Sequence, residues 1–323
     1  MSDTCKRPLI ILTGPTAVGK TELSIRLAKA VNGEIISADS MQVYKGMDIG
    51  TAKITAEEMQ GVKHYLVDCF EPKDDFNIVI FQRMAKAAME EIYAAGKVPI
   101  IVGGTGFYIQ SVLYDIEFED DGTEDEVENE FRVKMRKLAL EKGSEYLHEK
   151  LREVDPESAD AIHHNNLKRV IRALEYYEQT GRKISEHNKE QQQKESPYNF
   201  AYFVLNDDRE VLYKRIDKRV DIMFEAGLEQ EVKRLIDEGL TKENVSMQGI
   251  GYKEMFGYFD GEYDIERAKY LIKLDTRHFA KRQLTWFRRE NSVLWVDYQD
   301  YGSDKDAMLW AMVEKLKDKG IVE

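Results

Sequence analysis

The feature that most constrains the fold is a glycine-containing turn near the N-terminus. It reads GPTAVGKT from Gly14 to Thr21, which is the P-loop spacing of a glycine, four residues, and then glycine, lysine and threonine. The turn follows the short apolar run 9–12 and precedes a helical pattern over residues 22–31. A strand, this turn and a helix N-terminus together direct backbone N–H groups at phosphate oxygens. The sequence therefore predicts a polyphosphate site, and leaves open whether phosphate is transferred, hydrolysed or expelled.

Charged and hydroxyl side chains near this turn suggest its chemistry. Lys20 supplies a positive charge that reaches the terminal phosphate, and Thr21 offers a hydroxyl to Mg²⁺ that bridges phosphates. Asp39 ends the next apolar run, and ligands of parallel sheets lie beyond the carboxyl ends of strands, so we expect Asp39 beside the P-loop. Asp68 ends a third run; an Mg²⁺-holding aspartate of a kinase or ATPase would fit there, and a turn or helix-capping aspartate fits at least as well.

Alternation of short apolar runs with helical patterns predicts the fold class. The expected strands are residues 9–12, 34–39, 64–68, 98–102, 199–205 and 293–296. The fourth runs into a second glycine turn, residues 103–106. This order is typical of an α/β, P-loop NTPase-like parallel sheet flanked by helices. Residues 116–198 begin acidic and then read as charged helices, so we expect an all-helical insertion domain within a core of residues 1–115 and 199–323.

Composition narrows the class of protein. The 323 residues carry a formal net charge of −13, which argues against bulk nucleic-acid binding but allows a local basic patch. Two cysteines do not form a disulfide framework. No apolar run approaches the length of a membrane span, and the N-terminal residues lack a signal-peptide pattern, so we expect a reduced, cytoplasmic protein with no membrane partner.

The most basic helix is expected over residues 267–289. His278, Lys281, Arg282, Thr285 and Arg289 recur on one face, with Phe279, Gln283 and Trp286 beside them. A basic stripe next to aromatic rings suits RNA phosphates and bases, although a core-docked helix with a solvated basic face is equally consistent. Arg215 and Arg219 also share a helix face; pairing with nearby acids explains them better than a phosphate clamp.

Five segments in order resemble the bacterial tRNA dimethylallyltransferase (tRNA isopentenyltransferase) family, over nearly the whole chain. They are the P-loop, the segment SADSMQVYKGMDIGTAK over residues 37–53, Gly103-Gly104-Thr105, Gly251-Tyr252, and KRQLTW over residues 281–286. The resemblance implies transfer of a dimethylallyl group from dimethylallyl diphosphate to N6 of adenosine 37, next to the anticodon, in tRNAs that read codons beginning with U. The P-loop then holds a diphosphate leaving group, with Mg²⁺ on Thr21 as the cofactor.

The resemblance also implies roles for individual residues. Asp39 would be the general base on the adenine amine, assisted by Thr16, Lys20 and Arg219. The diphosphate-binding residues would be Gly14, Pro15, Thr16, Ala17, Val18, Gly19, Lys20, Thr21, Arg215 and Arg219. The residues that would contact tRNA are Asp39, Ser40, Met41, Gln42, Thr105, Lys168, Arg169, Arg172, Gly249, Gly251, Tyr252, Lys281, Arg282, Gln283, Trp286 and Arg288. The insertion would grip the anticodon stem-loop, and the enzyme would act as a monomer.

Three rival functions share parts of this pattern. A small-molecule kinase has the P-loop and the sheet, but requires a nucleoside triphosphate. An adenylate isopentenyltransferase shares the chemistry but uses a free nucleotide, whereas the insertion and the basic helix favour RNA. A non-catalytic RNA-binding protein has no need of an intact Lys20, Thr21 and Asp39.

Overall fold

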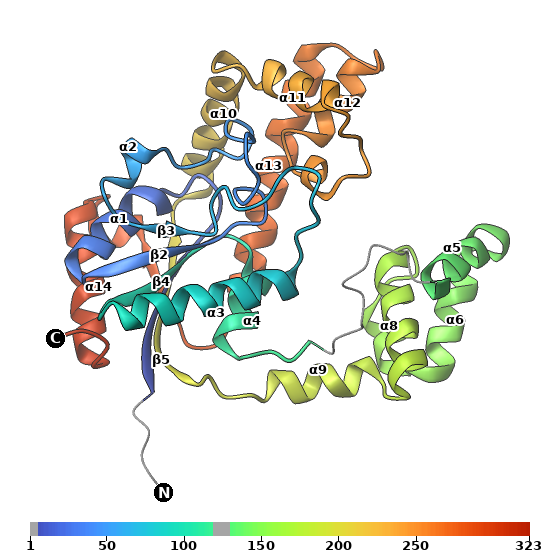
Figure 1. The fold of residues 1–323 in the computed structure, drawn as a ribbon, viewed down its shortest axis with the longest axis horizontal. Coiled ribbons are helices and arrows are strands. Elements are labelled where there is room, and N and C mark those ends of the chain that lie inside the picture. Colours follow the sequence, from blue (N-terminus) through green and yellow to red (C-terminus); the bar gives the residue numbers. More distant parts are fainter. Residues whose placement is uncertain (1–5, 119–129) are drawn as a thin grey trace, which may run out of the picture. The chain divides into compact units, whose positions relative to one another are not determined.

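The structure, a computed structural model, describes residues 6–118 and 130–323 (Figure 1). The chain divides into a sheet-containing unit, residues 1–113 and 197–323, and a helical unit, residues 114–196. Most of the acidic stretch at the start of the expected insertion, residues 119–129, lies outside the described residues. In the described parts of the chain, no helix is both long and apolar enough to cross a membrane.

A six-stranded sheet organises the first unit, in the order β3-β2-β4-β1-β5-β6, with every strand pair parallel. The strands are β1 Arg7–Thr13, β2 Gly33–Ala38, β3 His64–Tyr65, β4 Val98–Gly103, β5 Tyr198–Asn206 and β6 Val293–Asp297. β1 is central, with Ile10 opposite Ile100 of β4 and Ala201 of β5. A central parallel strand is covered on both faces, which is why it reads as an unbroken apolar run. The predicted α/β fold class is confirmed.

The third strand is shorter than expected. Leu66 and Asp68 have positive φ angles of 61° and 54°, so the backbone leaves the extended region directly after Tyr65. The next helix starts at Ile78. Its cap is the side chain of Asn77, which accepts from two backbone N–H groups at 3.0 Å.

Helices cover both faces of the sheet (Figure 1). All the helices that the structure describes in the first unit are α1 Lys20–Ala30, α2 Ala56–Met59, α3 Ile78–Ala94, α4 Gly106–Leu113, α10 Arg209–Glu225, α11 Leu228–Asp237, α12 Lys253–Phe259, α13 Ile265–Phe287 and α14 Lys305–Asp318, with 3₁₀ turns η1 Val245–Gln248 and η2 Tyr298–Tyr301.

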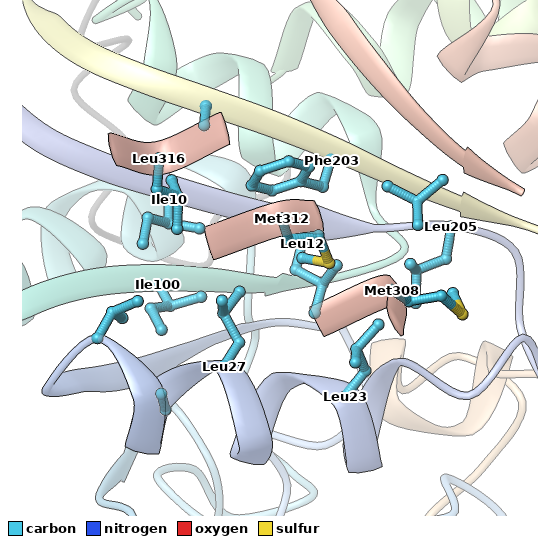
Figure 2. Close-up of a cluster of buried hydrophobic side chains, with 14 of the residues drawn as sticks. Ile10, Leu12, Leu23, Leu27, Ile100, Phe203, Leu205, Met308, Met312 and Leu316 are labelled. Carbon is cyan, nitrogen blue, oxygen red and sulfur yellow. The ribbon is translucent and has the colours of Figure 1, made fainter. Parts of the chain in front are cut away.

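One face of the sheet packs against α1 and α14 (Figure 2). The side chains that meet there are Ile10, Leu12, Leu23, Leu27, Ile100, Phe203, Leu205, Met308, Met312 and Leu316. They come from strands at the centre of the sheet and from helices almost 300 residues apart in the chain. The C-terminal helix therefore belongs to the same core as the helix that follows the P-loop.

The second unit is all helical within its described residues. Its helices are α5 Glu130–Lys142, α6 Ser144–Val154, α7 Pro156–Ala161, α8 Leu167–Thr180 and α9 Ile184–Gln192. Leu147, Leu151 and Val170 are fully buried in its own core. Asp155 caps α7, as its position before Pro156 predicts. Burial would raise the pKa of Asp155, but hydrogen bonds from Ser158 and Ser185 outweigh it and lower the pKa.

Met312→Ala should destabilise the sheet unit by about 2–5 kcal/mol, because it removes a buried side chain and leaves a cavity between α14 and the sheet. Met312 is 1% exposed, whereas Trp310 on the same helix is 68% exposed. Trp310→Ala is the matched control and should change stability by less than about 0.5 kcal/mol. Urea unfolding followed by far-UV circular dichroism measures both, and equal effects would contradict the packing described for α14.

Candidate active site

Backbone crowding fixes the shape of the turn from Gly14 to Thr21, which is called the phosphate-binding turn after its predicted ligand. A Cβ on Gly14 would lie 2.5 Å from the Leu205 carbonyl oxygen, and a Cβ on Gly19 would lie 2.7 Å from the Tyr298 hydroxyl. Both glycines also have positive φ angles, 147° and 99°. A side chain at either position would therefore be strained and would collide with β5 or η2. The turn from Gly14 to Thr21 is therefore packed closely against β5 and η2, and glycine at these two positions is what allows that packing.

Lys20 lies inside the turn. Its Nζ donates to the carbonyl oxygens of Gly14 and Pro15, both at 2.9 Å. Burial and the nearby Arg219 guanidinium lower the pKa of Lys20 to about 7, and Asp39 opposes this shift. The pKa of Arg219 is likewise lowered by burial, with Asp39 opposing. Two cations and one carboxylate thus interact at the carboxyl edge of the sheet.

A small cavity of about 70 Å³ connects the turn with Asp39. Its lining residues are Lys20, Thr21, Ser24, Ile35, Ser37, Asp39, Gln42, Ile54, His64, Val67, Val102 and Gly103. Charged and hydroxyl groups lie beside aliphatic side chains in this lining. Such a surface suits a ligand with one anionic end and one apolar end.

Asp39 follows β2 and is held by its own turn. Its Oδ1 accepts hydrogen bonds from the backbone N–H groups of Met41 at 2.8 Å and Gln42 at 3.3 Å. Within the described residues, the other carboxylate oxygen makes no hydrogen bond. The carboxylate is therefore oriented by one oxygen and has the other available to a ligand. The Gln42 amide donates to backbone carbonyls of the loop after it, and Ser40 and Met41 are partly exposed.

Asp68 has a different role from a metal-holding aspartate. Its Oδ1 lies 2.5 Å from Lys53 Nζ, which also donates to the Tyr44 carbonyl at 2.6 Å and to Asp48 at 2.7 Å. Only 5% of the Lys53 side chain is exposed. Lys53 thus ties the loop 46–53 together, and Asp68 serves that turn, which is the simpler of the two explanations that the sequence allowed.

Glu231 of α11 grips the same loop from the other side. Its Oε2 accepts from the N–H groups of Asp48 and Ile49, both at 2.8 Å, and its Oε1 accepts from Gly50 N–H at 3.0 Å. The Tyr252 hydroxyl donates to the same Oε1 at 2.7 Å. No sequence pattern indicates this role, because a glutamate on an amphipathic surface helix is typical of a solvated charge.

The environment of Tyr252 corrects its predicted contact with tRNA. The side chain is 0% exposed, and a Cβ on Gly50 would lie 2.5 Å from its ring. Gly249 and Gly251 are buried as well. The Tyr252 side chain therefore supports the loop 46–53 and does not face a macromolecular ligand.

The second glycine turn packs directly against α13. A Cβ on Gly104 would lie 2.1 Å from Gln283 Nε2, and a Cβ on Gly106 would lie 2.2 Å from Trp286 Nε1. Gln283 donates to the Gly104 carbonyl at 3.0 Å and accepts from Thr16 N–H at 2.9 Å. It is 5% exposed. This corrects its predicted contact with tRNA, because both ends of the amide are bonded to backbone. Thr105, in the same turn, is partly exposed.

The basic stripe on α13 lines a groove. Its residues are His278, Lys281, Arg282, Thr285, Trp286 and Arg289, around a volume of about 420 Å³. The Arg282 guanidinium lies 5.7 Å from the Phe279 ring centroid, and Phe107 meets Trp286 edge to face at 6.3 Å. Arg288, at the C-cap of the helix, is exposed. Cations and aromatic edges therefore share one open surface.

Arg215 and Arg219 differ in environment. Arg215 pairs with the buried Asp207 at 2.9 Å and lies 5.4 Å from the Tyr298 ring centroid. The Arg215 guanidinium thus has a partner beside η2, and its predicted contact with diphosphate stays a prediction. Arg219 forms no ion pair within the described residues and interacts with Lys20 and Asp39.

The expected RNA contacts on α8 belong to the helical unit. Lys168 and Arg169 are exposed in its first turn. Arg172 pairs at 3.1 Å with Glu175, which is fully buried and also binds Arg132 at 2.7 Å. The Arg172 side chain thus has a structural partner in its own unit.

Comparison with known proteins identifies the family. The family model described as IPP transferase matches residues 42–290. The chain belongs to the IPP transferase family. A tRNA dimethylallyltransferase of Lachnoclostridium phytofermentans is 59% identical, over 98% of this chain and 100% of that protein. Another from Bacillus cytotoxicus is 50% identical, over 97% of each.

Solved structures of the IPP transferase family share the fold. The full-length tRNA isopentenylpyrophosphate transferase of Bacillus halodurans is 44% identical, with a TM-score of 0.71 and 98% of each chain covered. A eukaryotic dimethylallyltransferase, described as acting on tRNA, is 32% identical with a TM-score of 0.78 over 90% of this chain and 74% of that one. The family resemblance expected from the sequence is confirmed.

Lys20→Met should stabilise the ligand-free protein more at pH 6 than at pH 10. The folded-state pKa of Lys20 is about 7, below its ordinary value of 10.5, so the unfolded state binds more protons between these values. The cost of the buried ammonium is therefore complete below pH 7 and fades as the pH rises towards 10.5. Melting temperatures at the two pH values measure the difference. Lys29→Met, on the exposed side of the same helix, is the control, and the same pH-dependent gain there would contradict the assignment.

Proposed function

We propose that this protein transfers a dimethylallyl group from dimethylallyl diphosphate to N6 of adenosine 37 in tRNAs that read codons beginning with U. The observation that carries the proposal is the cavity lined by Lys20, Thr21 and Asp39. Its lining contains charged and hydroxyl groups that can bind an anion, with aliphatic side chains beside them. Membership of the IPP transferase family and the names of the relatives support the same reaction.

In the proposed reaction the diphosphate end lies in the phosphate-binding turn. The C–O bond of the allylic carbon breaks, and its electron pair leaves with diphosphate. The turn's N–H groups, Lys20 and Arg219 stabilise that developing negative charge, and the Thr16 hydroxyl donates to the same oxygens. Lys20 is lightly hydrated, with its pKa lowered to about 7, so an incoming anion restores its preference for the charged form.

The acceptor side of the reaction is assigned to Asp39. The N6 amine forms the new bond to carbon, and its proton passes to the carboxylate oxygen of Asp39 that is not held by Met41 and Gln42. An exocyclic adenine amine is a weak nucleophile, so a carboxylate fixed in direction contributes orientation as well as basicity. The base must leave its stack to reach the cavity, as with other base-modifying enzymes.

Mg²⁺ fits the donor set at this edge. Thr21 and Asp39 offer oxygen atoms to one cavity, and no group of three or more potential metal ligands among His, Cys, Asp and Glu occurs in the described residues. That suits an ion that keeps its waters and binds largely through phosphate oxygens. When bound, Mg²⁺ supplies charge neutralisation of the diphosphate. Thr21 is the residue of this chain assigned to hold it.

The RNA side of the proposal uses two surfaces. The groove on α13 presents Lys281, Arg282 and Trp286 to the anticodon stem-loop, with Arg288 near its end. In the helical unit, exposed Lys168 and Arg169 are assigned to the anticodon arm. We assign the reaction to a monomeric enzyme.

The test of this function is mass spectrometry of unmodified tRNA after incubation with the protein, dimethylallyl diphosphate and Mg²⁺. The expected product carries one added C5H8 unit at adenosine 37, and pyrophosphate inhibits competitively against dimethylallyl diphosphate. Tight ATP binding with useful hydrolysis and no RNA product would favour a small-molecule kinase and defeat the proposal.

Asp39→Asn should lower turnover by about 10²–10⁴, the usual range for a positioned general base. The amide oxygen still accepts from Met41 and Gln42, so the turn is preserved, and diphosphate affinity should hardly change. Single-turnover rates across a Mg²⁺ titration provide the measurement. Rescue by added Mg²⁺ would show that Asp39 acts through the metal. Asp68→Asn is the control at a neighbouring strand end and should retain most of the activity.

Replacing Lys281 and Arg282 together by Ala should weaken binding of tRNA whatever its sequence. The salt dependence of tRNA binding should become shallower. Each lost phosphate contact reduces the slope of log K against log salt by about 0.7–0.9. Dimethylallyl diphosphate affinity should be unaffected. A double Ala variant of Lys315 and Lys317, exposed on α14, removes the same charge elsewhere and should leave the slope unchanged. An unchanged slope in the α13 variant would assign the stripe to solvent.

A further inference from the structure

Gln283 is the buried polar residue of α13, a helix whose neighbouring polar side chains reach solvent. It is 5% exposed, and its amide is hydrogen-bonded at both ends to backbone groups from distant parts of the chain. Oε1 accepts from Thr16 N–H at 2.9 Å, and Nε2 donates to the Gly104 carbonyl at 3.0 Å. Each end of the amide thus makes one hydrogen bond to backbone, and the side chain links α13 to the phosphate-binding turn and to the second glycine turn.

The surroundings of this amide leave it little freedom. The two turns follow neighbouring strands, β1 and β4, and Thr13 Oγ1 donates to the Gly103 carbonyl at 2.6 Å between them. A Cβ on Gly104 would lie 2.1 Å from Gln283 Nε2, so the glycine leaves only the room that the amide fills. Loss of the amide would leave an N–H and a carbonyl group unsatisfied beside the diphosphate site.

The same helix carries the basic groove. Arg282 precedes Gln283 in the chain and Trp286 lies one turn later, and both line the groove. Trp286 also touches the second glycine turn, where a Cβ on Gly106 would lie 2.2 Å from its Nε1. A ligand that binds in the groove and shifts or stiffens α13 therefore also affects Gln283, which accepts a hydrogen bond from Thr16 N–H.

We propose that Gln283 is a positioning residue that acts through Thr16 and couples occupancy of the α13 groove by RNA to the affinity of the phosphate-binding turn for diphosphate. This rests on the proposed function, which supplies the two ligands. When the groove is filled, α13 holds the amide in place, and Thr16 is fixed in its diphosphate-binding conformation. Thermodynamic linkage requires the reverse as well: diphosphate must tighten RNA binding by the same factor.

A second glutamine provides a matched comparison. Gln110 of α4 donates to Glu290 Oε1 at 2.7 Å, just beyond the end of α13, and has no contact with the phosphate-binding turn among its described hydrogen bonds. Burial raises the pKa of Glu290 to about 7. Gln110→Met therefore breaks an amide contact at the end of the same helix and leaves Thr16 and Gly104 untouched.

The experiment is calorimetric titration of Mg²⁺-pyrophosphate into the full-length protein, with and without a saturating unmodified anticodon stem-loop RNA. In the wild type, RNA should tighten pyrophosphate binding by about fivefold or more, the lower end of usual coupling. Gln283→Met should bring this factor close to one while each ligand still binds alone. Gly104→Ala, which pushes the amide aside without removing any hydrogen-bonding group, should do the same. Gln110→Met should keep the wild-type factor.

The outcomes separate the two proposals. Wild-type coupling that persists in Gln283→Met, or wild-type binding of both ligands without coupling, overturns the role of Gln283 and leaves the proposed function standing. Failure of the wild type to bind RNA or pyrophosphate alone defeats the proposed function, and the coupling with it. Reciprocity is checked by titrating RNA with and without pyrophosphate, a readout that a purely structural role would not change. If Gln283→Met does not fold, Gly104→Ala decides the question.

Discussion

The candidate site at the carboxyl edge of the sheet depends on a steric constraint. Its backbone must come closer to neighbouring groups than a Cβ would allow. Gly14 and Gly19 let β5 and η2 close on the phosphate-binding turn, and Gly104 and Gly106 let α13 close on the turn beside it. These contacts bring a strand end and a 3₁₀ turn onto the phosphate-binding turn, and a long helix onto the turn beside it. The direction of the phosphate-binding N–H groups thus follows from packing on all sides and not from the turn alone.

A charge imbalance at this edge follows from that packing. Burial leaves Lys20 and Arg219 poorly hydrated, and nearby carboxylates, Asp39 for both and Glu58 for Arg219, only partly offset this, so each cation has a pKa below its usual value. The free protein carries this cost, and a multiply charged anion removes it on binding. Under the proposed function, part of the affinity for diphosphate would therefore come from relief of an unfavourable arrangement that the fold enforces.

Sequence pattern and spacing predicted the elements that have a regular pattern of residues. Buried strands appear as apolar runs, the P-loop as fixed spacing, and the stripe from His278 to Arg289 as helical periodicity, and each survives in the structure. Glu231, Tyr252 and Gln283 were missed or misassigned because their partners are main-chain groups distant in the sequence, which leave no pattern. Resemblance to an RNA-contacting segment does not tell the residue that touches a ligand from the one that holds the segment in place. Boundaries erred where single residues, such as Leu66, take positive φ angles.

The grip of Glu231 on three consecutive N–H groups has a consequence for biosynthesis. The loop 46–53 is made early, but the carboxylate that satisfies it lies 183 residues later than Asp48. At 5–20 residues per second, the ribosome needs roughly 10–40 s to supply that partner. During that interval the N–H groups of Asp48, Ile49 and Gly50 in the nascent chain lack their Glu231 acceptor. The loop 46–53 can therefore become rigid only after α11 has been synthesised, long after the strand that precedes it.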